Sequence, residues 1–323
     1  MRSPAEAGIS VEGERRPGKI AFVFPGQGTQ HAGMGREIYE HYPVAKRVFD
    51  MASQLLRFDI ARLCFEGPEK ELSKTIHAQP AIVVNSLAAY AAVQEVNSHL
   101  EPDFVAGHSL GQLSAAAVAG SIRFEDAICL AGERGRITQE HISEALGGMA
   151  AFLGASLEAI EEICRRTGTF LANHNGPGQI VISGLTENLE KAKDLAREYG
   201  VRRIIPLAIG GPFHSPYMAD AETEFKKAVD RIKVADPDIP FVSNERGFVC
   251  LLGEEVRRSI AGGLTGPVKW RESMQGIIDE GVNVMYEFGG SLDGVLTGIL
   301  RKINPQVKGF IVNNLQSLRQ VSA

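Results

Sequence analysis

The chain has 323 residues, of which 44% are hydrophobic, so it can form one large domain or two modest ones with a sizeable core. Its formal net charge of -5 provides no basic field for nucleic acid or an anionic membrane. The four cysteines, Cys64, Cys129, Cys164 and Cys250, have no CxxC or CxxH spacing, so we predict scattered buried thiols in a reducing compartment and no disulfide or zinc framework.

The N-terminus and the apolar segments bear on targeting. Residues 1–19 mix charges, Gly and Pro without an apolar h-region, so they predict a disordered leader and not a secretory signal. No apolar run reaches the roughly 18 residues that a membrane span needs. We therefore expect a cytoplasmic globular protein.

Strands and helices alternate in the first part of the chain. Residues 20–24 form an apolar run that ends at the turn pair Pro25-Gly26, and residues 104–106 form another; both are typical of buried strands. Apolar positions at helical spacing predict helices over residues 35–56, 80–96 and 110–119. This alternation favours a parallel sheet covered by helices.

The pattern changes after about residue 145. Strand-like segments at 149–153, 180–182 and 203–207 are separated by charged amphipathic helices at 157–166 and 186–199. A β-α-β-β-α-β order is typical of a ferredoxin-like unit. We predict a small subdomain at residues 145–208, inserted into a large one at residues 20–144 and 209–323 that includes a further strand at 241–243.

A G-x-S-x-G sequence, Gly107-His108-Ser109-Leu110-Gly111, lies between a predicted strand and a helix of small residues. A sharp strand-to-helix turn exposes such a serine, and flanking glycines let the backbones pass. The start of the helix offers N–H groups to an oxyanion. Because the flanking elements are of the expected types, a nucleophile is favoured over an ordinary Gly-rich turn.

A serine hydroxyl needs a base to remove its proton. Among the eight histidines, His108 lies inside the turn and is expected to pack beside the serine. His214 follows Gly210-Gly211-Pro212-Phe213 in a loop suited to a positioned group. Spacing alone leaves His214 open between a catalytic base and a loop histidine bonded to backbone.

Five motifs occur along the chain in a fixed order. They are residues 22–30 (FVFPGQGTQ), 107–111 (GHSLG), Arg134-Gly135-Arg136 with Gln139, Asn173 and Asn175 with 177–184 (PGQIVISG), and 211–215 (GPFHS). Together they resemble the malonyl-CoA:acyl-carrier-protein transacylases and the related acyltransferases of polyketide synthases. The resemblance extends from about residue 20 to residue 318, and five collinear motifs are far more specific than one.

The resemblance implies an α/β fold with a hydrolase-like parallel-sheet core and a ferredoxin-like insertion, in agreement with the patterns above. It implies that Ser109 is acylated and that His214 is general base and then general acid. The backbone N–H groups of Gln27 and Leu110 would form the oxyanion hole. The carbonyl of Gly263, in place of a carboxylate, would orient the histidine.

Three further residues are implied to support the site: His108, Asn175 and Asn244. No metal ligand and no permanently bound cofactor are expected, since coenzyme A enters as the thioester substrate. A dinucleotide interpretation of Gly26-Gln27-Gly28 fails because His31 stands where the G-x-G-x-x-G pattern needs glycine.

Arg134 is the residue that bears on the acyl group. Composition alone favours a solvated helix arginine paired with Glu133 or Glu140. In the family that it resembles, this arginine binds the distal carboxylate of malonate, to which a planar guanidinium can bond bidentately. Phe213 resembles the bulky residue of malonyl-selecting members, which leaves little room for an α-methyl branch.

Three departures from the family pattern leave the acyl group open. Gln112 stands where glutamate is usual, Thr138 where methionine is common, and residues 289–294 (GGSLDG) replace a shorter Gly-Pro-Gly turn. The leading hypothesis is malonyl transfer from coenzyme A to an acyl-carrier protein in fatty-acid or polyketide biosynthesis. The alternatives are a specialised acyltransferase or hydrolase acting on other acyl-carrier thioesters, and a non-catalytic docking module.

The expected partner is an acyl-carrier protein. Such carriers are usually acidic, so a local basic patch is expected despite the net charge of -5. Arg202-Arg203 and Arg257-Arg258 are candidates, and each pair is equally consistent with solvated surface. No nucleic acid and no membrane are expected as partners.

Overall fold

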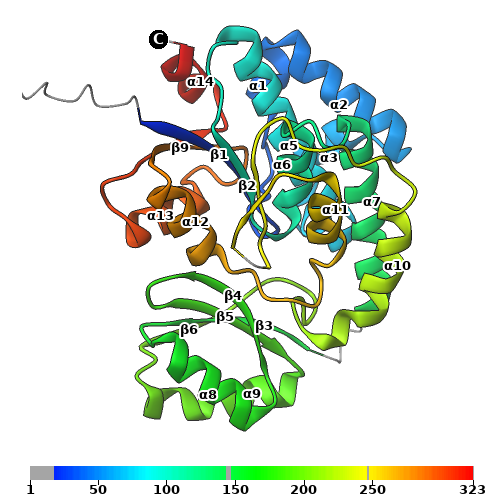
Figure 1. Cartoon of the computed structure of the whole chain (residues 1–323). Coiled ribbons are helices and arrows are strands. Elements are labelled where there is room, and N and C mark those ends of the chain that lie inside the picture. The colour runs from blue at the N-terminus through cyan, green and yellow to red at the C-terminus, as the bar shows by residue number, and fades with distance from the viewer. Residues whose placement is uncertain (1–17, 143–146, 246, 323) are drawn as a thin grey trace, which may run out of the picture.

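The computed structural model describes residues 18–142, 147–245 and 247–322, in which two β-sheets are covered by helices (Figure 1). The larger sheet has six strands in the order β10-β9-β1-β2-β7-β8. Their bounds are β1 Lys19–Phe24, β2 Phe104–Gly107, β7 Phe241–Val242, β8 Val249–Cys250, β9 Val282–Phe288 and β10 Lys308–Val312. All pairs are parallel except β7 with the edge strand β8, so the prediction of a parallel-sheet α/β core is confirmed.

Both faces of this sheet are buried. Phe22 and Phe24 of β1 point into the larger core, while Ala21 and Val23 point into a second core on the opposite face. Strands buried on both sides read as continuous apolar runs, which explains the run at the start of the chain. Helices α12 (Trp270–Asp279) and α13 (Val295–Ile303) cover the second face.

The first face is covered by many helices. Their bounds are α1 Arg36–His41, α2 Pro43–Leu56, α3 Ile60–Glu66, α4 Glu69–Leu72, α5 Thr75–Val96, α6 Gln112–Val118, α7 Phe124–His141, α10 Ala219–Val229, α11 Gly253–Ala261 and α14 Leu315–Ser322. Of the described helices, α5 is long and apolar enough to cross a membrane by length and composition. Because 83% of that stretch is buried inside the fold, α5 is a core helix.

Two predicted helix boundaries are wrong. The helix expected over residues 35–56 is broken at Tyr42, which is extended because the following Pro43 disfavours helical geometry before it and begins α2. The helix expected from Pro80 begins at Thr75, five residues earlier (80 − 75), and passes through the proline. Burial of both sides of α5 outweighs the backbone hydrogen bond that Pro80 cannot donate.

The smaller sheet follows the ferredoxin-like prediction. Strands β3 (Gly148–Leu153), β4 (Phe170–Gly176), β5 (Gln179–Gly184) and β6 (Arg203–Pro206) are antiparallel in the order β4-β5-β3-β6. Helices α8 (Leu157–Thr167) and α9 (Thr186–Ala196) complete the β-α-β-β-α-β order. Figure 1 shows these helices on the side of the sheet away from the larger sheet, so its other face is turned toward the rest of the molecule.

A short backbone bridge joins the two parts. The His174 N–H of β4 donates to the Val268 carbonyl (2.9 Å), and the Val268 N–H donates to the Ala172 carbonyl (2.8 Å). The small sheet therefore continues into the loop before α12. The predicted leader lies outside the described residues up to residue 17, whereas Lys19 already belongs to β1.

Candidate active site

Ser109 lies at the sharp turn between β2 and α6, in a 3-10 turn of residues Ser109–Gly111. Its φ of 51° is in the left-handed region, which a non-glycine residue enters only with strain. Gly107 has no room for a side chain, because an added Cβ would come within 2.0 Å of the Gly111 backbone. The turn thus folds back on itself and presents the serine hydroxyl at the end of the strand.

Asn244, after β7, braces this turn with both ends of its amide. Its Oδ1 accepts from the Ser109 N–H (2.6 Å), and its Nδ2 donates to the Gly107 carbonyl (2.7 Å). Gln112 joins the same network, since its Oε1 accepts from the Asn244 N–H (3.4 Å) and from the Ser259 hydroxyl (2.6 Å). Asn244 therefore supports the site by holding the backbone of the turn at residues 107–111, the elbow.

His214 meets the serine hydroxyl from the loop before α10. Its Nε2 lies 2.9 Å from Ser109 Oγ, and its own φ of 60° is also left-handed. Burial, reinforced by the charge of Arg134, lowers the pKa of His214 to about 3. The imidazole is consequently neutral near pH 7 and able to accept the proton of the serine.

The carbonyl that orients His214 is that of Gly266, so the expectation of Gly263 is wrong. His214 Nδ1 lies 3.0 Å from the Gly266 oxygen, and the His214 N–H donates to Leu264 O (2.8 Å). Gly263 instead packs under the elbow helix, where an added Cβ would lie 3.3 Å from Gln112 Nε2. The family resemblance locates this loop, but the bend of its backbone decides which carbonyl reaches the imidazole.

Glu222 of α10 holds this loop in place. Its Oε2 accepts from the Leu264 N–H (3.1 Å), the Thr265 N–H (2.9 Å) and the Thr265 hydroxyl (2.8 Å). The same loop supplies both carbonyls that bind His214. A carboxylate thus acts on the histidine through the backbone, without touching the imidazole.

His108 is bonded to the small sheet and not to the serine hydroxyl. Its Nε2 donates to Asn175 Oδ1 of β4 (2.8 Å), and its ring packs on Trp270 at 5.3 Å between centroids. Burial lowers the pKa of His108, and the bond to Asn175 acts in the opposite direction. This contact ties the elbow to the small sheet and leaves His214 as the imidazole at the nucleophile.

Arg134 of α7 points its guanidinium into the site. Nη1 donates to Gln79 Oε1 (2.8 Å), and Nη2 approaches Ser109 Oγ (3.4 Å). Only 4% of the residue is exposed, and burial lowers the pKa of Arg134 to about 10, so it stays charged at neutral pH. In the described part of the chain, no carboxylate lies within 4.0 Å of it.

A cavity of about 460 Å³ brings the predicted residues together. Gln27, His108, Ser109, Arg134, Asn175, Phe213 and His214 all line it, with residues from β5, β6 and α13. Gly26 allows the loop of Gln27 to approach the elbow, because a Cβ there would lie 2.6 Å from the His108 carbonyl. Leu110 is buried directly after the serine.

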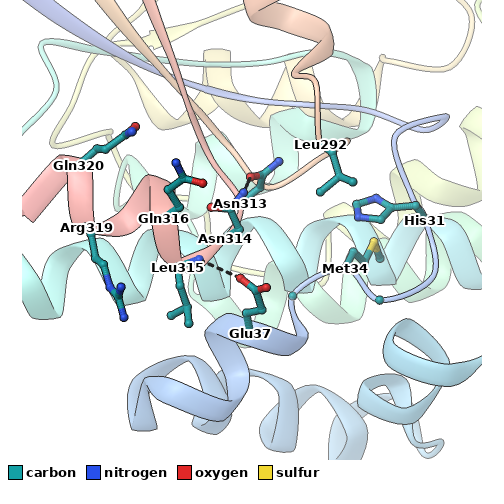
Figure 2. Close-up of a pocket in the computed structure, with 12 residues that line it drawn as sticks. His31, Met34, Glu37, Leu292, Asn313, Asn314, Leu315, Gln316, Arg319 and Gln320 are labelled. Atoms are coloured by element: carbon teal, nitrogen blue, oxygen red, sulfur yellow. Dashed lines mark hydrogen bonds between the residues drawn. The ribbon is translucent and has the colours of Figure 1, made fainter.

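A second opening, of about 730 Å³, lies between the loop of His31 and Met34 and the start of α14 (Figure 2). The Leu315 N–H donates to Glu37 Oε2 (3.2 Å) and joins its two sides. Neither Ser109 nor His214 lines this opening. The smaller cavity, which holds the paired serine and histidine, is therefore the candidate active site.

The basic pairs differ in their surroundings. Arg257 donates to the Val229 and Ile232 carbonyls, so its guanidinium is used within the fold. Arg202 and Arg203 are exposed at the start of β6, whose other end, Pro206, lines the cavity. Among the described residues, no group of three or more His, Cys, Asp or Glu side chains could hold a metal ion.

Sequence reasoning missed Gly266, Gln79 and Glu222. The Gly266-Pro267 pair is a turn signal and predicts irregular backbone at this position. A carbonyl outside a helix or sheet can bond to a side chain, so this signal could have pointed to the loop. Gln79 and Glu222 carry no local signal, since each acts on residues distant in the sequence.

Comparisons with known proteins agree with this geometry. The model of the family described as "Acyl transferase domain" matches residues 21–287. A malonyl CoA-acyl carrier protein transacylase of Bacillus subtilis strain 168 is 40% identical over 305 residues, which are 93% of this chain and 95% of that protein. The Haemophilus influenzae protein of the same name is 35% identical and covers 94% of this chain and 98% of its own length.

Solved structures show the same likeness. An acyl carrier protein S-malonyltransferase of Vibrio cholerae superposes with a TM-score of 0.89 at 34% identity and covers 94% of this chain and 99% of its own. A malonyl-transacylase solved in complex with its type II PKS acyl-carrier protein has a TM-score of 0.89 at 35% identity, with 94% and 98% covered.

Proposed function

Because the chain belongs to the malonyl CoA-acyl carrier protein transacylase family, we propose that it carries a malonyl group from coenzyme A to the phosphopantetheine thiol of an acyl-carrier protein through an ester on Ser109. The observation that carries the proposal is the buried Arg134, beside a serine paired with a neutral histidine. An acyl group that ends in a carboxylate supplies the direct ion-pair partner that the guanidinium lacks, since the charge of Glu222 acts on it only from a longer distance.

In the first half-reaction, Ser109 Oγ attacks the thioester carbonyl while His214 Nε2 takes its proton. The tetrahedral oxyanion collapses, the C–S bond breaks, and the imidazolium returns the proton to the departing thiolate of coenzyme A. In the second half-reaction, His214 takes the proton of the carrier thiol, whose sulfur attacks the ester, and protonates Ser109 as it leaves. One imidazole thus serves both directions, and no bound cofactor is required.

We assign oxyanion stabilisation to the backbone N–H groups of Gln27 and Leu110. Two observations support this assignment: Leu110 follows the nucleophile directly within the 3-10 turn, and Gly26 brings the loop of Gln27 against the elbow. Such donors act on charge that develops only in the transition state. The carbonyl of Gly266, rather than a carboxylate, would stabilise the imidazolium that forms on His214.

Phe213 supports malonyl over branched acyl groups. It is buried at 4% exposure and lines the cavity beside the histidine, so an α-methyl branch would meet its ring. The second candidate function is hydrolysis, or transfer of other carrier-bound acyl groups, since water can attack the same ester. Arg134 favours a dicarboxylic acyl group and so the first function.

We further propose that the carrier protein docks near exposed Arg202 and Arg203, at the start of the strand that leads to the cavity. We also propose that residues 20–144 and 209–323 form a large subdomain and residues 145–208 a small one, with the cavity between them. We place the protein in the cytoplasm, where the thiols of buried Cys64 and Cys164 and of exposed Cys129 would stay reduced.

The central test is the mass of the acyl-enzyme. Wild type exposed to malonyl-CoA should gain one malonyl group on the peptide that contains Ser109, and Ser109→Ala should gain none while remaining folded. Malonyl on that peptide in the mutant, or normal turnover, would remove the covalent mechanism. Release of the acyl group by water as fast as by a pantetheine thiol would favour the hydrolase.

A second test addresses the base. His214→Ala should slow both loading and release, because the imidazole acts in each. His108→Ala is the matched control, because it loses the bond to Asn175 but keeps the proposed base. Its loading and release should slow less than those of His214→Ala. Near-normal rates for His214→Ala would assign the base to another residue.

A further inference from the structure

Thr138 lies one helical turn after Arg134 on α7 and is fully buried. Its hydroxyl donates to the Arg134 carbonyl at 2.6 Å and lies 3.1 Å from Gln79 Nε2 of α5. Gln79 is also fully buried, and its Oε1 accepts from Arg134 Nη1 at 2.8 Å. A chain of hydrogen bonds thus runs from Thr138 through Gln79 to the guanidinium.

The donors and acceptors in this chain fix its direction. A threonine hydroxyl has one proton, and here that proton goes to the Arg134 carbonyl. The hydroxyl can then only accept from Gln79, so the amide must turn its NH₂ group toward Thr138. The carbonyl end of Gln79 consequently faces Arg134, where a guanidinium needs an acceptor.

From this geometry we propose that Thr138 is a specificity-determining positioning residue, which sets the orientation of Gln79 and through it the position of Arg134 for a carboxylate-bearing acyl group. The inference rests on the proposed malonyl transfer and adds a residue with no charge and no contact to the acyl chain. Without the hydroxyl, the Gln79 NH₂ group loses its acceptor, and the bond to Arg134 alone holds the amide. The Gln79 side chain then has more freedom to move, and the position of the guanidinium that it anchors is less fixed.

This arrangement matters because Arg134 has no other anchor of this kind. In the described part of the chain its side chain bonds to Gln79 and, at 3.4 Å, to Ser109 Oγ, which the acyl group will occupy. Gln79 is therefore the contact that remains after the serine is acylated. A guanidinium that Gln79 already holds in place binds a carboxylate without first being ordered. The preference for a charged acyl group therefore depends on the relay, by which we mean the hydrogen bonds from Thr138 through Gln79 to Arg134.

The test compares Thr138→Val, which keeps the shape, with Thr138→Ser, which keeps the hydroxyl. Loading of Ser109 from malonyl-CoA and from acetyl-CoA is measured for each by intact mass. We expect Thr138→Val to lower the ratio of malonyl to acetyl kcat/KM about two- to tenfold, the range for loss of one neutral hydrogen bond. Thr138→Ser should keep the ratio near that of wild type.

Thr167→Val is the matched control. Thr167 is a buried threonine of α8 whose hydroxyl donates to the carbonyl four residues earlier, Ile163 (2.8 Å), as Thr138 does to Arg134. It lies in the small subdomain, where its hydroxyl bonds to Ile163 and Thr169 and not to Gln79 or Arg134, so its loss should leave the ratio unchanged. An equal fall in malonyl and acetyl loading for Thr138→Val would indicate general damage and overturn the specificity role.

Gln79→Met tests the relay from its other member and covers the case of a Thr138→Val protein that does not fold. It should lower the ratio at least as much as Thr138→Val, and the double variant should be no worse than Gln79→Met alone. Additive losses, or an unchanged ratio in Gln79→Met, would overturn the relay. If the wild-type protein takes up no malonyl, the proposed function itself is overturned. If the wild-type protein is malonylated but the malonyl-to-acetyl ratio is unchanged in every variant, only this inference is refuted.

Discussion

Two arginines of helix α7, two positions apart, have opposite surroundings. Arg136 has a side chain that is 39% exposed and contacts three carboxylates, those of Glu133 (3.0 Å), Glu140 (2.6 Å) and Glu224 (2.9 Å). Arg134 is 4% exposed, and no carboxylate of the described residues lies within 4.0 Å of it. Two residues turn about 200° around a helix, so one arginine faces solvent and the other the cavity.

The difference shows how a chain keeps a cation available for substrate. Exposed arginines attract carboxylates readily, and each such pair contributes little to stability. A buried guanidinium without a counter-charge is costly to the fold. The cavity around Arg134 supplies neutral acceptors, Gln79 and Ser109, which satisfy N–H groups without neutralising the charge. An incoming carboxylate therefore has no protein carboxylate to displace.

The largest expected effect comes from removing the buried cation. Arg134→Ala should lower malonyl kcat/KM by roughly ten- to 150-fold, the value of one charge-assisted contact of about 1.5–3 kcal/mol. Acetyl-CoA, which has no distal carboxylate, should lose little, so preference shifts toward uncharged acyl groups. Arg134→Lys should retain only part of the wild-type malonyl kcat/KM, because an ammonium lacks the planar fork of a guanidinium. The measurement is loading by mass or radiolabel, and equal losses for both acyl groups would make Arg134 a structural residue.

A smaller effect should appear in the pH dependence. Burial first, and then the charge of Arg134, lower the pKa of His214 to about 3, so the imidazole stays neutral well below its usual range. Wild-type acetylation of Ser109 should therefore hold its rate as the pH falls through about 6.5, the ordinary histidine value. Removing the positive charge makes the imidazolium less unfavourable, which raises its pKa. The acid limb of Arg134→Ala, measured with acetyl-CoA, should lie at higher pH than that of wild type, and coincident limbs would contradict the coupling.

The smallest effect is expected at the exposed arginine. Arg136→Ala removes three ion pairs, yet exposed pairs are screened, so the free energy of unfolding should fall by about 1 kcal/mol or less. Malonyl and acetyl loading should both stay close to wild type, because Arg136 does not line the cavity of Ser109. Urea denaturation and the loading assay measure the two quantities. A loss of malonyl preference here would mean that the two faces of α7 are not independent.

The sequence predicted the chemistry of the site better than the contacts that position it. Ser109 could be found because a G-x-S-x-G turn between a strand and a helix has a local mechanical reason, and the β-α-β-β-α-β order has a local periodic signal. His214 and Arg134 needed the family resemblance. Gly266 and Gln79 escaped because their roles depend on how segments far apart in the chain meet.

The same reasoning explains the errors at helix ends. Residues 35–56 keep one apolar periodicity across a break at Tyr42, so periodicity alone could not show the break that Pro43 causes. At α5, a proline usually marks a helix start, but tertiary burial carried the helix five residues further back (80 − 75). Local rules failed where packing against the rest of the molecule outweighed them.

The left-handed backbone at Ser109 and His214 has a consequence for how this sequence can evolve. Each such conformation costs a non-glycine residue roughly 1–3 kcal/mol, which the surrounding fold must outweigh. Glycine would relieve the cost at either position and abolish the reaction. Selection for fold stability and selection for turnover therefore oppose each other at these two positions. In a related protein that no longer needs this reaction, we expect these positions to change to glycine or asparagine, which tolerate the left-handed conformation. Such a change in a related sequence would indicate that the activity has been lost, even where the other site residues are retained.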